Sequence, residues 1–491
     1  MSMLHEDRLF IGGEWQAPKS GARLESIDPS TEEVWATVPD AGPADVDLAV
    51  AAAREALDGP WSRLTATRRG RLLTELAALL ERDATSLGEL ESRDNGKPLR
   101  DTVGEVRRAA EWLRYYGGAA DKLQGDVIPY RPGAHAFTRL EPVGVVGAVT
   151  PWNSPISLYA WKLGPALATG NVVVLKPAEQ TSVSALAFAR LVHDAGLPPG
   201  VVNIVPGRGA GAGHALVSHP GVDKISFTGS YETARQIMRS AADGLKRVSF
   251  ECGGKSPHIV FADADLERAI TVATHSAFRS TGQSCSAGSR LLVQREVYDE
   301  VLDALTARAE RIRVGPALDP RTHIGPQTSA EQLDKTRRYI ELGLDEGGRV
   351  VTGGGRPLGL DRGYFVQPTV FEGLANGSRL AQEEVFGPVL TVIPFDTEEE
   401  AVAIANDTTY GLVAGLWTRD VGRAHRVSER LQAGLVSVNT FRPVHWTLPY
   451  GGYKQSGLGR ENGLAVLREY VEVKSVVVDY GDDAPEDPFA D

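Results

Sequence analysis

Short, valine-rich apolar runs alternate with helical stretches through the first half of the chain. The runs are residues 143–149, 171–175, 201–205, 224–227 and 247–250, and residues 182–193 have helical periodicity between two of them. Alternation of this kind builds a parallel sheet with helices on both faces. Such sheets bind ligands at the carboxyl ends of their strands. We therefore predict a doubly wound α/β unit with a ligand site at that edge.

A second alternation of strands and helices follows Gly253. Residues 257–261 and 291–293 have the composition of strands, and residues 265–276 and 297–311 have helical periodicity. Upstream of both units, the alanine-rich residues 46–57 and the leucines of residues 72–80 predict two packing helices. Because 491 residues exceed what one hydrophobic core holds, we expect two or three structural units.

Residues 126–141 predict a β-hairpin, because two extended runs flank the turn-forming pair Pro132 and Gly133. Near the end of the chain, residues 470–480 form a valine-rich strand with no partner close in sequence. An apolar terminal strand pairs either with a hairpin elsewhere in its chain or with another subunit. We therefore predict a small β extension.

Composition excludes several classes of protein. A net charge of −12 argues against a general nucleic-acid binder, which needs a basic face to neutralise phosphates. We find neither a signal-peptide core in residues 1–10 nor an apolar stretch of the roughly 20 residues that span a bilayer. Cys252 and Cys285 are the two cysteines, too few for a disulfide framework or a zinc site. The expectation is a cytoplasmic enzyme without a structural metal.

Three polar side chains suited to catalysis lie in loops or at a strand end. Cys285 is surrounded by small residues in the segment TGQSCSAG (281–288), which suits an exposed thiol, although a lone cysteine is more often a small buried hydrophobe. Glu251 ends an apolar strand, where burial would raise its pKa towards that of a general base; a solvated turn glutamate is the alternative. Asn153 follows a strand in a loop fixed by prolines. Its amide suits a developing oxyanion, but the pattern alone is better explained by an ordinary proline-rich loop.

Two further segments suit a dinucleotide. Lys176 and Glu179 follow a strand at the position where doubly wound folds bind a ribose, and a glutamate there would repel a 2′-phosphate. Ordinary polarity at a helix start also explains them. Residues 227–230 (FTGS) lead from a strand into a helix start, whose free N–H groups and Ser230 hydroxyl suit a pyrophosphate. The glycines of residues 207–213 lack the Gly-x-Gly-x-x-Gly spacing.

Taken in order along the chain, these segments resemble the aldehyde dehydrogenase superfamily. The matching motifs are PWN (151–153), KPAE (176–179), FTGS (227–230), ECGGKSP (251–257), GQSC (282–285), EVFGP (384–388) and GGYKQSG (451–457). Each motif is modest alone, but a chance match of all of them in this order is very unlikely. The resemblance extends through the N-terminal helices and the C-terminal strand, so it covers nearly the whole chain.

The resemblance implies an α/β fold of two doubly wound parallel-sheet domains with a small β oligomerisation extension. The NAD-binding domain would comprise residues 1–124 and 143–252, and the catalytic domain residues 253–455. The extension would comprise the hairpin 125–142 and residues 456–491. The family forms dimers and tetramers, so a homodimer or, by our preference, a homotetramer is expected.

The resemblance also assigns roles to particular residues. Cys285 would be the nucleophile, Glu251 the general base, and Asn153 with the Cys285 backbone N–H the oxyanion hole. The residues expected to bind NAD, or NADP as the alternative, are Thr150, Trp152, Lys176, Glu179, Gly229, Ser230, Glu384 and Phe386. The chain would oxidise a small-molecule aldehyde to a carboxylic acid through a thiohemiacetal and then a thioester that water hydrolyses.

The substrate is indicated by departures from the common family pattern. Arg279 stands where general aldehyde dehydrogenases often carry phenylalanine and where succinate-semialdehyde dehydrogenases carry a carboxylate-binding arginine. Trp161 replaces the second such arginine, and Ser154 replaces an aromatic residue beside Asn153. The residues expected to bind substrate are Arg279, Trp161, Arg442 and Val444. A guanidinium suits a carboxylate, so a carboxylate-bearing semialdehyde is one prediction. A neutral aromatic or aliphatic aldehyde is the other.

Three other functions compete with hydrolytic aldehyde oxidation. CoA-acylating relatives typically lack the base corresponding to Glu251, so its presence argues against them. A cysteine hydrolase would need a histidine beside Cys285, and His275 is the nearest in sequence. A scaffold without activity would be expected to have lost the nucleophile or the cofactor residues, and all of these are present.

Overall fold

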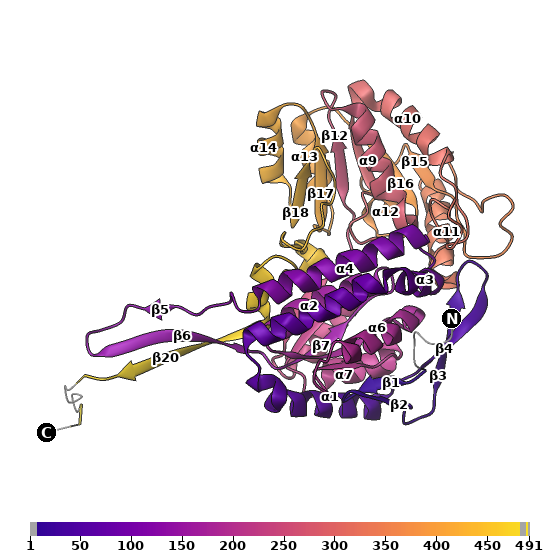
Figure 1. The fold of residues 1–491 in the computed structure, drawn as a ribbon. Coiled ribbons are helices and arrows are strands. Elements are labelled where there is room, and N and C mark those ends of the chain that lie inside the picture. The colour runs from indigo at the N-terminus through magenta and orange to yellow at the C-terminus, as the bar shows by residue number, and fades with distance from the viewer. Residues whose placement is uncertain (1–6, 482–487, 490–491) are drawn as a thin grey trace.

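The computed structural model describes residues 7–481 and 488–489, and its first unit is built on an eight-stranded sheet (Figure 1). The strand order is β19-β11-β10-β7-β8-β9-β1-β2. The five central strands are parallel: β7 (Val145–Val149), β8 (Val172–Lys176), β9 (Val202–Ile204), β10 (Lys224–Thr228) and β11 (Arg247–Glu251). They are the five strands predicted from the valine-rich runs, with ends shifted by one or two residues.

Antiparallel strands complete both edges of this sheet. β1 (Leu9–Ile11) and β2 (Glu14–Gln16) extend one edge, and β19 (Gly457–Leu458) pairs with β11 at the other. The sequence-based boundary at residue 456 assigned β19 to the extension. In the structure its backbone bonds to β11, because a two-residue strand beside Glu251 can continue the ladder there.

Eight helices accompany the first sheet. They are α1 (Pro43–Asp58), α2 (Ala66–Arg82), α3 (Ala84–Asn95), α4 (Leu99–Ala119), α5 (Pro155–Ala168), α6 (Val183–Asp194), α7 (His214–Ser218) and α8 (Tyr231–Ala242). In α2 the leucines at 72, 73, 76 and 80 are buried on one face, because helical spacing aligns them. Helix α4 packs against both α2 and α5, and this arrangement brings the start of α4 towards the loop after β7.

The second unit is a seven-stranded sheet in the order β14-β15-β16-β13-β12-β17-β18. Its strands are β12 (Pro257–Val260), β13 (Arg290–Gln294), β14 (Arg349–Thr352), β15 (Thr369–Glu372), β16 (Val389–Phe395), β17 (Val413–Trp417) and β18 (Leu435–Val438). All neighbours are parallel except β14 and β15. Its helices are α9 (Leu266–Phe278), α10 (Tyr298–Glu310), α11 (Ala330–Asp345), α12 (Arg379–Gln382), α13 (Glu398–Asn406) and α14 (Val421–Arg430). The second α/β unit predicted from the sequence is therefore present.

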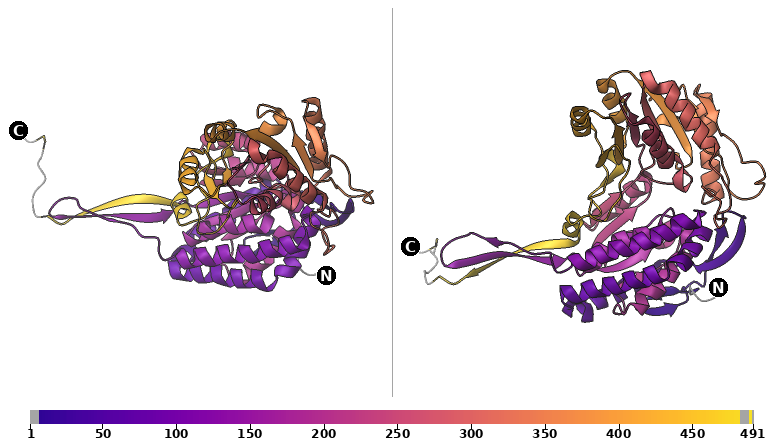
Figure 2. Two further views of the ribbon diagram at one scale, coloured as in Figure 1. Left: turned by 90° about the horizontal axis from the view of Figure 1, so that it is seen from above. Right: turned by 45° about the horizontal axis from the view of Figure 1, so that its top comes forward.

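A narrow three-stranded arm projects from the body of the molecule (Figures 1 and 2). It consists of β5 (Val127–Ile128), β6 (Ala134–Pro142) and β20 (Val471–Asp479), with β6 in the middle. Strands β6 and β20 pair along their whole length, from Val471 opposite Pro142 to Asp479 opposite Ala134. The predicted pairing of the terminal strand with the hairpin is confirmed. A separate hairpin, β3 (Arg23–Asp28) and β4 (Glu33–Pro39), lies near the N-terminal end.

The candidate site lies between the two sheets. Strands β7, β10 and β11 end at one edge of the first sheet, and residues of the loops that follow line the same cavity as the segment after α9 of the second unit. Residues from both units line a common cavity at this junction. The predicted site at the carboxyl ends of the strands is where the cavity lies.

Candidate active site

The cavity has a volume of about 450 Å³ and brings together most of the predicted site residues. It is lined by the loops after β7, β10 and β11, by α4 and α5, and by the segment after α9. The predicted residues in its wall are Trp152, Asn153, Trp161, Gly229, Ser230, Glu251, Arg279, Cys285, Glu384, Phe386, Arg442 and Val444. Thr150, Lys176 and Glu179 lie outside this wall.

Cys285 follows a backbone segment with unusual geometry. Helix α9 ends at Phe278, and Ser280, Thr281 and Gly282 then have φ values of 56°, 57° and 69° in the left-handed region. Two of these residues carry side chains, so the segment is strained. A side chain at position 282 would also collide with the Gly387 carbonyl.

Buried hydrogen bonds hold this strained segment. The Thr281 hydroxyl donates to the Gly325 carbonyl at 2.9 Å, and the Gln327 amide donates to the Thr281 carbonyl at 3.0 Å. The Gln283 side-chain oxygen accepts from the backbone N–H of Thr328 at 2.9 Å. The segment is thus tied to residues 325–328, which fixes the direction in which Cys285 leaves it.

The Cys285 thiol is partly buried and lies 3.8 Å from the Tyr450 hydroxyl. Burial, together with the negative charge of Glu384, raises the pKa of this thiol to about 11. The Tyr450 contact and the Arg442 charge act in the opposite direction. Without ligands, the thiol is therefore protonated at neutral pH, and attack on a carbonyl needs a proton acceptor.

Glu251 ends β11 and is only 4% exposed, yet neither of its carboxylate oxygens has a hydrogen-bond partner within the described residues. Burial raises the pKa of Glu251 well above its usual range, and the neighbouring Glu461 adds to the effect. Lys162 and Arg460 oppose this rise. An unpartnered carboxylate with a raised pKa facing a cavity is suited to accept a proton.

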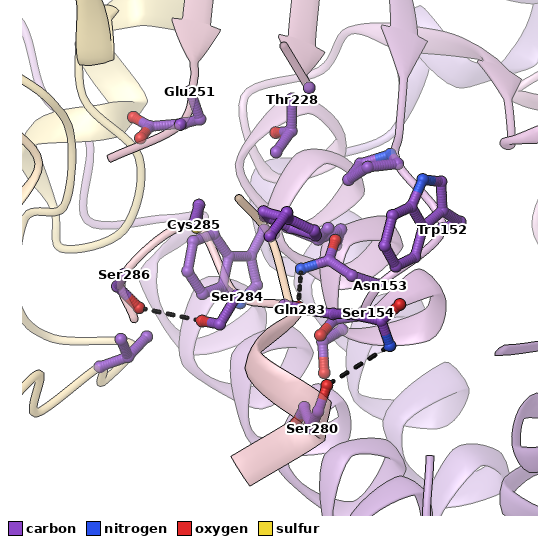
Figure 3. Close-up of a pocket in the computed structure, with 18 of the residues that line it drawn as sticks. Trp152, Asn153, Ser154, Thr228, Glu251, Ser280, Gln283, Ser284, Cys285 and Ser286 are labelled. Carbon is purple, nitrogen blue, oxygen red and sulfur yellow. Dashed lines mark hydrogen bonds between the residues drawn. The ribbon is translucent and has the colours of Figure 1, made fainter. Parts of the chain in front are cut away.

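Asn153 lies in the loop between β7 and α5, across the cavity from Glu251 (Figure 3). Its amide nitrogen donates to the backbone carbonyl of Gln283 at 3.1 Å. A carboxamide has two N–H groups, so this bond fixes the amide plane and leaves the second N–H available. The available N–H and the adjacent Cys285 can act on the same carbonyl group.

Beside Glu251 and Cys285, the cavity wall holds the N-terminus of α8, whose free backbone N–H groups suit an anionic group, and the buried carboxylate of Glu384. Ser230 caps the N-terminus of α8, and its hydroxyl accepts from the backbone N–H of Thr233 at 3.2 Å. Glu384 accepts from the backbone N–H of Gly254 at 3.0 Å, and burial raises the pKa of Glu384 to about 7. A Cβ at position 253 would collide with the Glu384 carboxylate, so glycine is needed there.

Lys176 and Glu179 lie together at the end of β8, with 3.8 Å between Lys176 Nζ and Glu179 Oε2. Lys176 Nζ also donates to the Gly207 carbonyl at 2.9 Å, and Glu179 accepts from the backbone N–H of Gly209 at 3.1 Å. Thr150 is buried, and its backbone N–H donates to the Lys176 carbonyl at 3.2 Å. These contacts join the glycine-rich loop after β9 to the predicted ribose site.

The two arginines predicted to bind substrate have different surroundings. Arg279 is 43% exposed and is already paired with Asp101, 2.8 Å away and 8% exposed. Arg442 lies deeper, and its guanidinium donates to the Ser284 hydroxyl at 2.5 Å and to the Ser286 hydroxyl at 3.3 Å. Burial lowers the pKa of Arg442, and the Arg279 charge lowers it further. We find no ion pair of Arg442 in residues 7–481 and 488–489.

An aromatic wall completes the substrate end of the cavity. Trp161 stacks on Trp112 with 5.5 Å between ring centroids, and Tyr450 meets Trp161 edge-on at 5.5 Å. Trp446 packs edge-on against Trp112 at the same distance. Val444 lies in the cavity wall as well. This end of the cavity is therefore both aromatic and cationic.

Several cavity residues were not found from the sequence. Tyr450 directly precedes the GGYKQSG motif, so its place beside that motif was the available signal. Arg108 lines the cavity from α4, and Lys335 lines it from α11. Both are ordinary charged positions on amphipathic helices, and no local pattern distinguishes them.

The fold and the site together define a class of protein. A cysteine held on a strained loop faces a buried carboxylate and a fixed carboxamide, beside a helix N-terminus at the carboxyl ends of parallel strands. This arrangement is suited to an enzyme whose cysteine attacks a carbonyl carbon beside a bound nucleotide.

Comparison with known proteins identifies the family to which this chain belongs. The profile of the aldehyde dehydrogenase family matches residues 15–476. The chain is 48% identical over 476 residues to the mitochondrial aldehyde dehydrogenase of Homo sapiens, covering 96% of this chain and 92% of that protein. It is 46% identical over 476 residues to an aldehyde dehydrogenase of Alternaria alternata, covering 96% and 95%. The chain therefore belongs to the aldehyde dehydrogenase family and is an oxidoreductase.

A solved structure extends the comparison to the fold. The NAD+ complex of an aldehyde dehydrogenase from Bacillus cereus superposes with a TM-score of 0.96 at 45% identity, covering 97% of each chain. This confirms the predicted α/β fold. Within the described residues, no helix has the length and apolar character to cross a membrane.

Proposed function

We propose that this protein is a hydrolytic, NAD-linked aldehyde dehydrogenase that carries the acyl group on Cys285. The observation that carries the proposal is the meeting of Cys285, Asn153 and Glu251 in one cavity. The NAD+ complex of the related Bacillus cereus enzyme supports the choice of cofactor.

The residues present fit a dinucleotide. Glu179 and Lys176 would hold the adenosine ribose, and the α8 N-terminus with Gly229 and Ser230 would hold the pyrophosphate. Glu384 would bind the nicotinamide ribose, and Phe386, in edge contact with Trp152 at 5.2 Å, would support the ring. Gly229 packs closely against the Phe227 ring, which a Cβ at position 229 would meet. When bound, NAD supplies the acceptor for the aldehyde hydride.

The chain's own residues then account for acyl-enzyme formation. The thiol gives up its proton, which we assign to Glu251, and the Cys285 sulfur attacks the aldehyde carbon. The oxygen becomes an oxyanion, stabilised by the free N–H of Asn153 and the Cys285 backbone N–H. Once the hydride has left, the carbonyl re-forms and the acyl group is a thioester on Cys285.

Hydrolysis completes the cycle. After the proton taken from the thiol has passed to solvent, Glu251 takes a proton from water and the hydroxide adds to the thioester carbon. The sulfur then leaves as a thiolate, which takes the proton from Glu251 as the carboxylic acid forms. Both oxygens of Glu251 lack protein partners, which leaves them free to bind that water. This step favours water over CoA as the acyl acceptor.

We propose a carboxylate-bearing aldehyde as the substrate class. Arg442 supports it, because a guanidinium in the cavity whose partners are two serine hydroxyls can take a substrate carboxylate as a further acceptor. Arg279 contributes less than the sequence predicted, since Asp101 already neutralises it. A neutral aromatic aldehyde remains the second candidate, and the wall of Trp112, Trp161 and Tyr450 favours it.

The test is NADH formation, measured by absorbance with matched pairs of carboxylate-bearing and neutral aldehydes of equal length. Cys285→Ser should abolish turnover, and persistent turnover would refute the mechanism. Arg442→Met should lower kcat/KM for the acidic member about 10- to 100-fold relative to its neutral partner, the worth of one charge-assisted hydrogen bond.

The ratio of kcat/KM for the acidic aldehyde to that for the neutral aldehyde separates two effects of Arg442→Met. Arg442 also bonds Ser284 and Ser286 beside the nucleophile, so the variant should slow both substrates. Arg279→Phe is the matched comparison and should change the ratio less than Arg442→Met. An unchanged ratio in both variants would reject the acidic substrate and favour the neutral aromatic one.

The competing chemistry has no support at the site. His275 lies exposed on α9, and no histidine is found among the cavity residues that the structure describes, so Cys285 lacks the base a cysteine hydrolase needs. Steady ester or peptide cleavage without NAD would overturn this. A requirement for CoA in product formation would replace the hydrolytic proposal with the acylating one.

We also propose that the arm mediates self-association. Val473, Val477 and Val478 of β20 are about half exposed, and Val127 of β5 is 75% exposed. Apolar strands that extend from the body are suited to pair with another copy. A homotetramer, with a dimer as the alternative, is expected by analytical ultracentrifugation. A cytoplasmic location stays a prediction.

A further inference from the structure

The connection between α3 and α4 carries a lysine that is almost completely buried. Lys97 is 2% exposed, and its ammonium group has three acceptors. They are the Glu105 carboxylate, the Asn153 backbone carbonyl at 2.9 Å and the Ser154 hydroxyl at 3.1 Å. An ammonium has three N–H donors, so this set satisfies all of them.

The ammonium is not needed to hold its own loop. The Lys97 backbone N–H donates to the Asn95 side-chain oxygen at 2.9 Å, and Leu99 N–H donates to the Ala317 carbonyl at 3.0 Å. Gly96 takes φ +81° and ends α3. Main-chain bonds therefore fix this connection, while the side chain reaches out to a different segment.

That segment is the loop carrying Asn153. The loop's carboxamide is bonded to Gln283 on the opposite side. Asn153 is consequently fixed at two points, its carbonyl by Lys97 and its amide by the loop that bears Cys285. Lys97 is not part of the cavity wall, so it acts on Asn153 and not on a ligand.

We propose that Lys97 is a positioning residue for the oxyanion site, acting through Asn153. Its bond to the Asn153 carbonyl sets the backbone orientation from which the free amide N–H points at the developing oxyanion. Glu105 pairs with the ammonium, so the buried charge of Lys97 has a carboxylate partner. The proposal rests on the oxyanion role of Asn153 proposed above.

The experiment measures the pre-steady-state burst of NADH, which reports the rate of thioester formation. Asn153→Ala should lower the burst rate about 100- to 1,000-fold, the cost of one oxyanion donor. Lys97→Met should lower it about 10- to 100-fold, because a misplacement of about 1 Å has that effect. The KM for aldehyde should change less than threefold.

The decisive variant combines the two substitutions. If Lys97 acts through Asn153, Lys97→Met should lower the burst rate less than about threefold in the Asn153→Ala background. The proposal would be overturned if Lys97→Met lowered the burst rate by the same factor in that background as it does alone. It would also be overturned if Lys97→Met alone left the rate unchanged. An unchanged burst in Asn153→Ala would instead refute the oxyanion role, so the two failures are distinguishable.

A conservative variant covers the case in which Lys97→Met does not fold. Lys97→Gln keeps a donor without the charge and should give a smaller loss that is also absent in the Asn153→Ala background. Lys246→Met is the matched control, since Lys246 also donates to a main-chain carbonyl, that of His219, at the opposite end of β11. It should leave the burst rate unchanged, and NAD binding should be retained in all variants.

Discussion

Replacing Glu179 by glutamine should shift the preference from NAD towards NADP. Glu179 is 40% exposed and lies 3.8 Å from Lys176 Nζ at the end of β8. In NADP the ribose 2′-hydroxyl carries a phosphate, which would lie next to this carboxylate. Repulsion between the two anions is the physical reason to expect a preference for NAD.

The size of the shift follows from the exposure of the carboxylate. A phosphate of about two negative charges at about 5 Å, screened as in water, is disfavoured by about 1.5 kcal/mol. Loss of a charged acceptor for the ribose hydroxyl weakens NAD by about 1 kcal/mol. The kcat/KM ratio of NAD to NADP should therefore fall about 30- to 100-fold in Glu179→Gln.

Lys176 adds a dependence on pH. Burial lowers the pKa of Lys176 to about 8, and the Glu179 charge partly offsets this. Removing that charge lowers the pKa of Lys176 further. Because the charged lysine attracts the phosphate, NADP use by the variant should be strongest at low pH and decline as pH rises towards 8.

The assay compares kcat/KM for both cofactors at constant ionic strength between about pH 6 and about pH 9. Glu75→Gln on α2 is the control, since Glu75 is an exposed carboxylate on a different helix. An unchanged cofactor ratio in Glu179→Gln would refute the assignment of the ribose site. A changed ratio without the decline at high pH would refute the role of Lys176.

Three further results are expected. Without cofactor, the rate at which iodoacetamide alkylates Cys285, followed by mass spectrometry, should rise about tenfold per pH unit below the thiol's pKa of about 11. Glu384→Gln should accelerate this alkylation. Glu251→Gln should slow the NADH burst, because the acceptor for the thiol proton is lost, and should lower turnover about 100-fold or more, along with any rise of kcat with pH, because the raised pKa of Glu251 makes its charged form the base at higher pH. Lys162→Met should lower the unfolding free energy by about 3–5 kcal/mol in urea, since it leaves Glu461, 2.7 Å away and buried, without its cation.

For the strands and helices that they named, periodicity and turn chemistry predicted most element ends to within a few residues, but they named no element between residue 311 and the terminal strand. The valine runs are buried on both faces in a parallel sheet, and this is why they were visible as continuous apolar stretches. The same reasoning marked Cys285, Glu251 and Asn153 only as candidates, because each adjoins a strand end or a glycine- or proline-fixed turn, and the family resemblance supplied their roles. It did not find Lys97 or Tyr450, whose roles depend on contacts with residues far away in sequence.

Arg279 shows why the substrate was harder to predict than the reaction. Its position six residues before the nucleophile can be read from the sequence, but whether its charge is available to a substrate cannot. Asp101 lies 178 positions earlier, and helix packing brings the two side chains together. Arg442 reaches the two serines beside Cys285 from a backbone with φ 43°, which no spacing pattern predicts. The proposed reaction rests on residues that local turns hold in place. The proposed substrate class depends on whether partners distant in sequence leave a guanidinium able to bind the substrate.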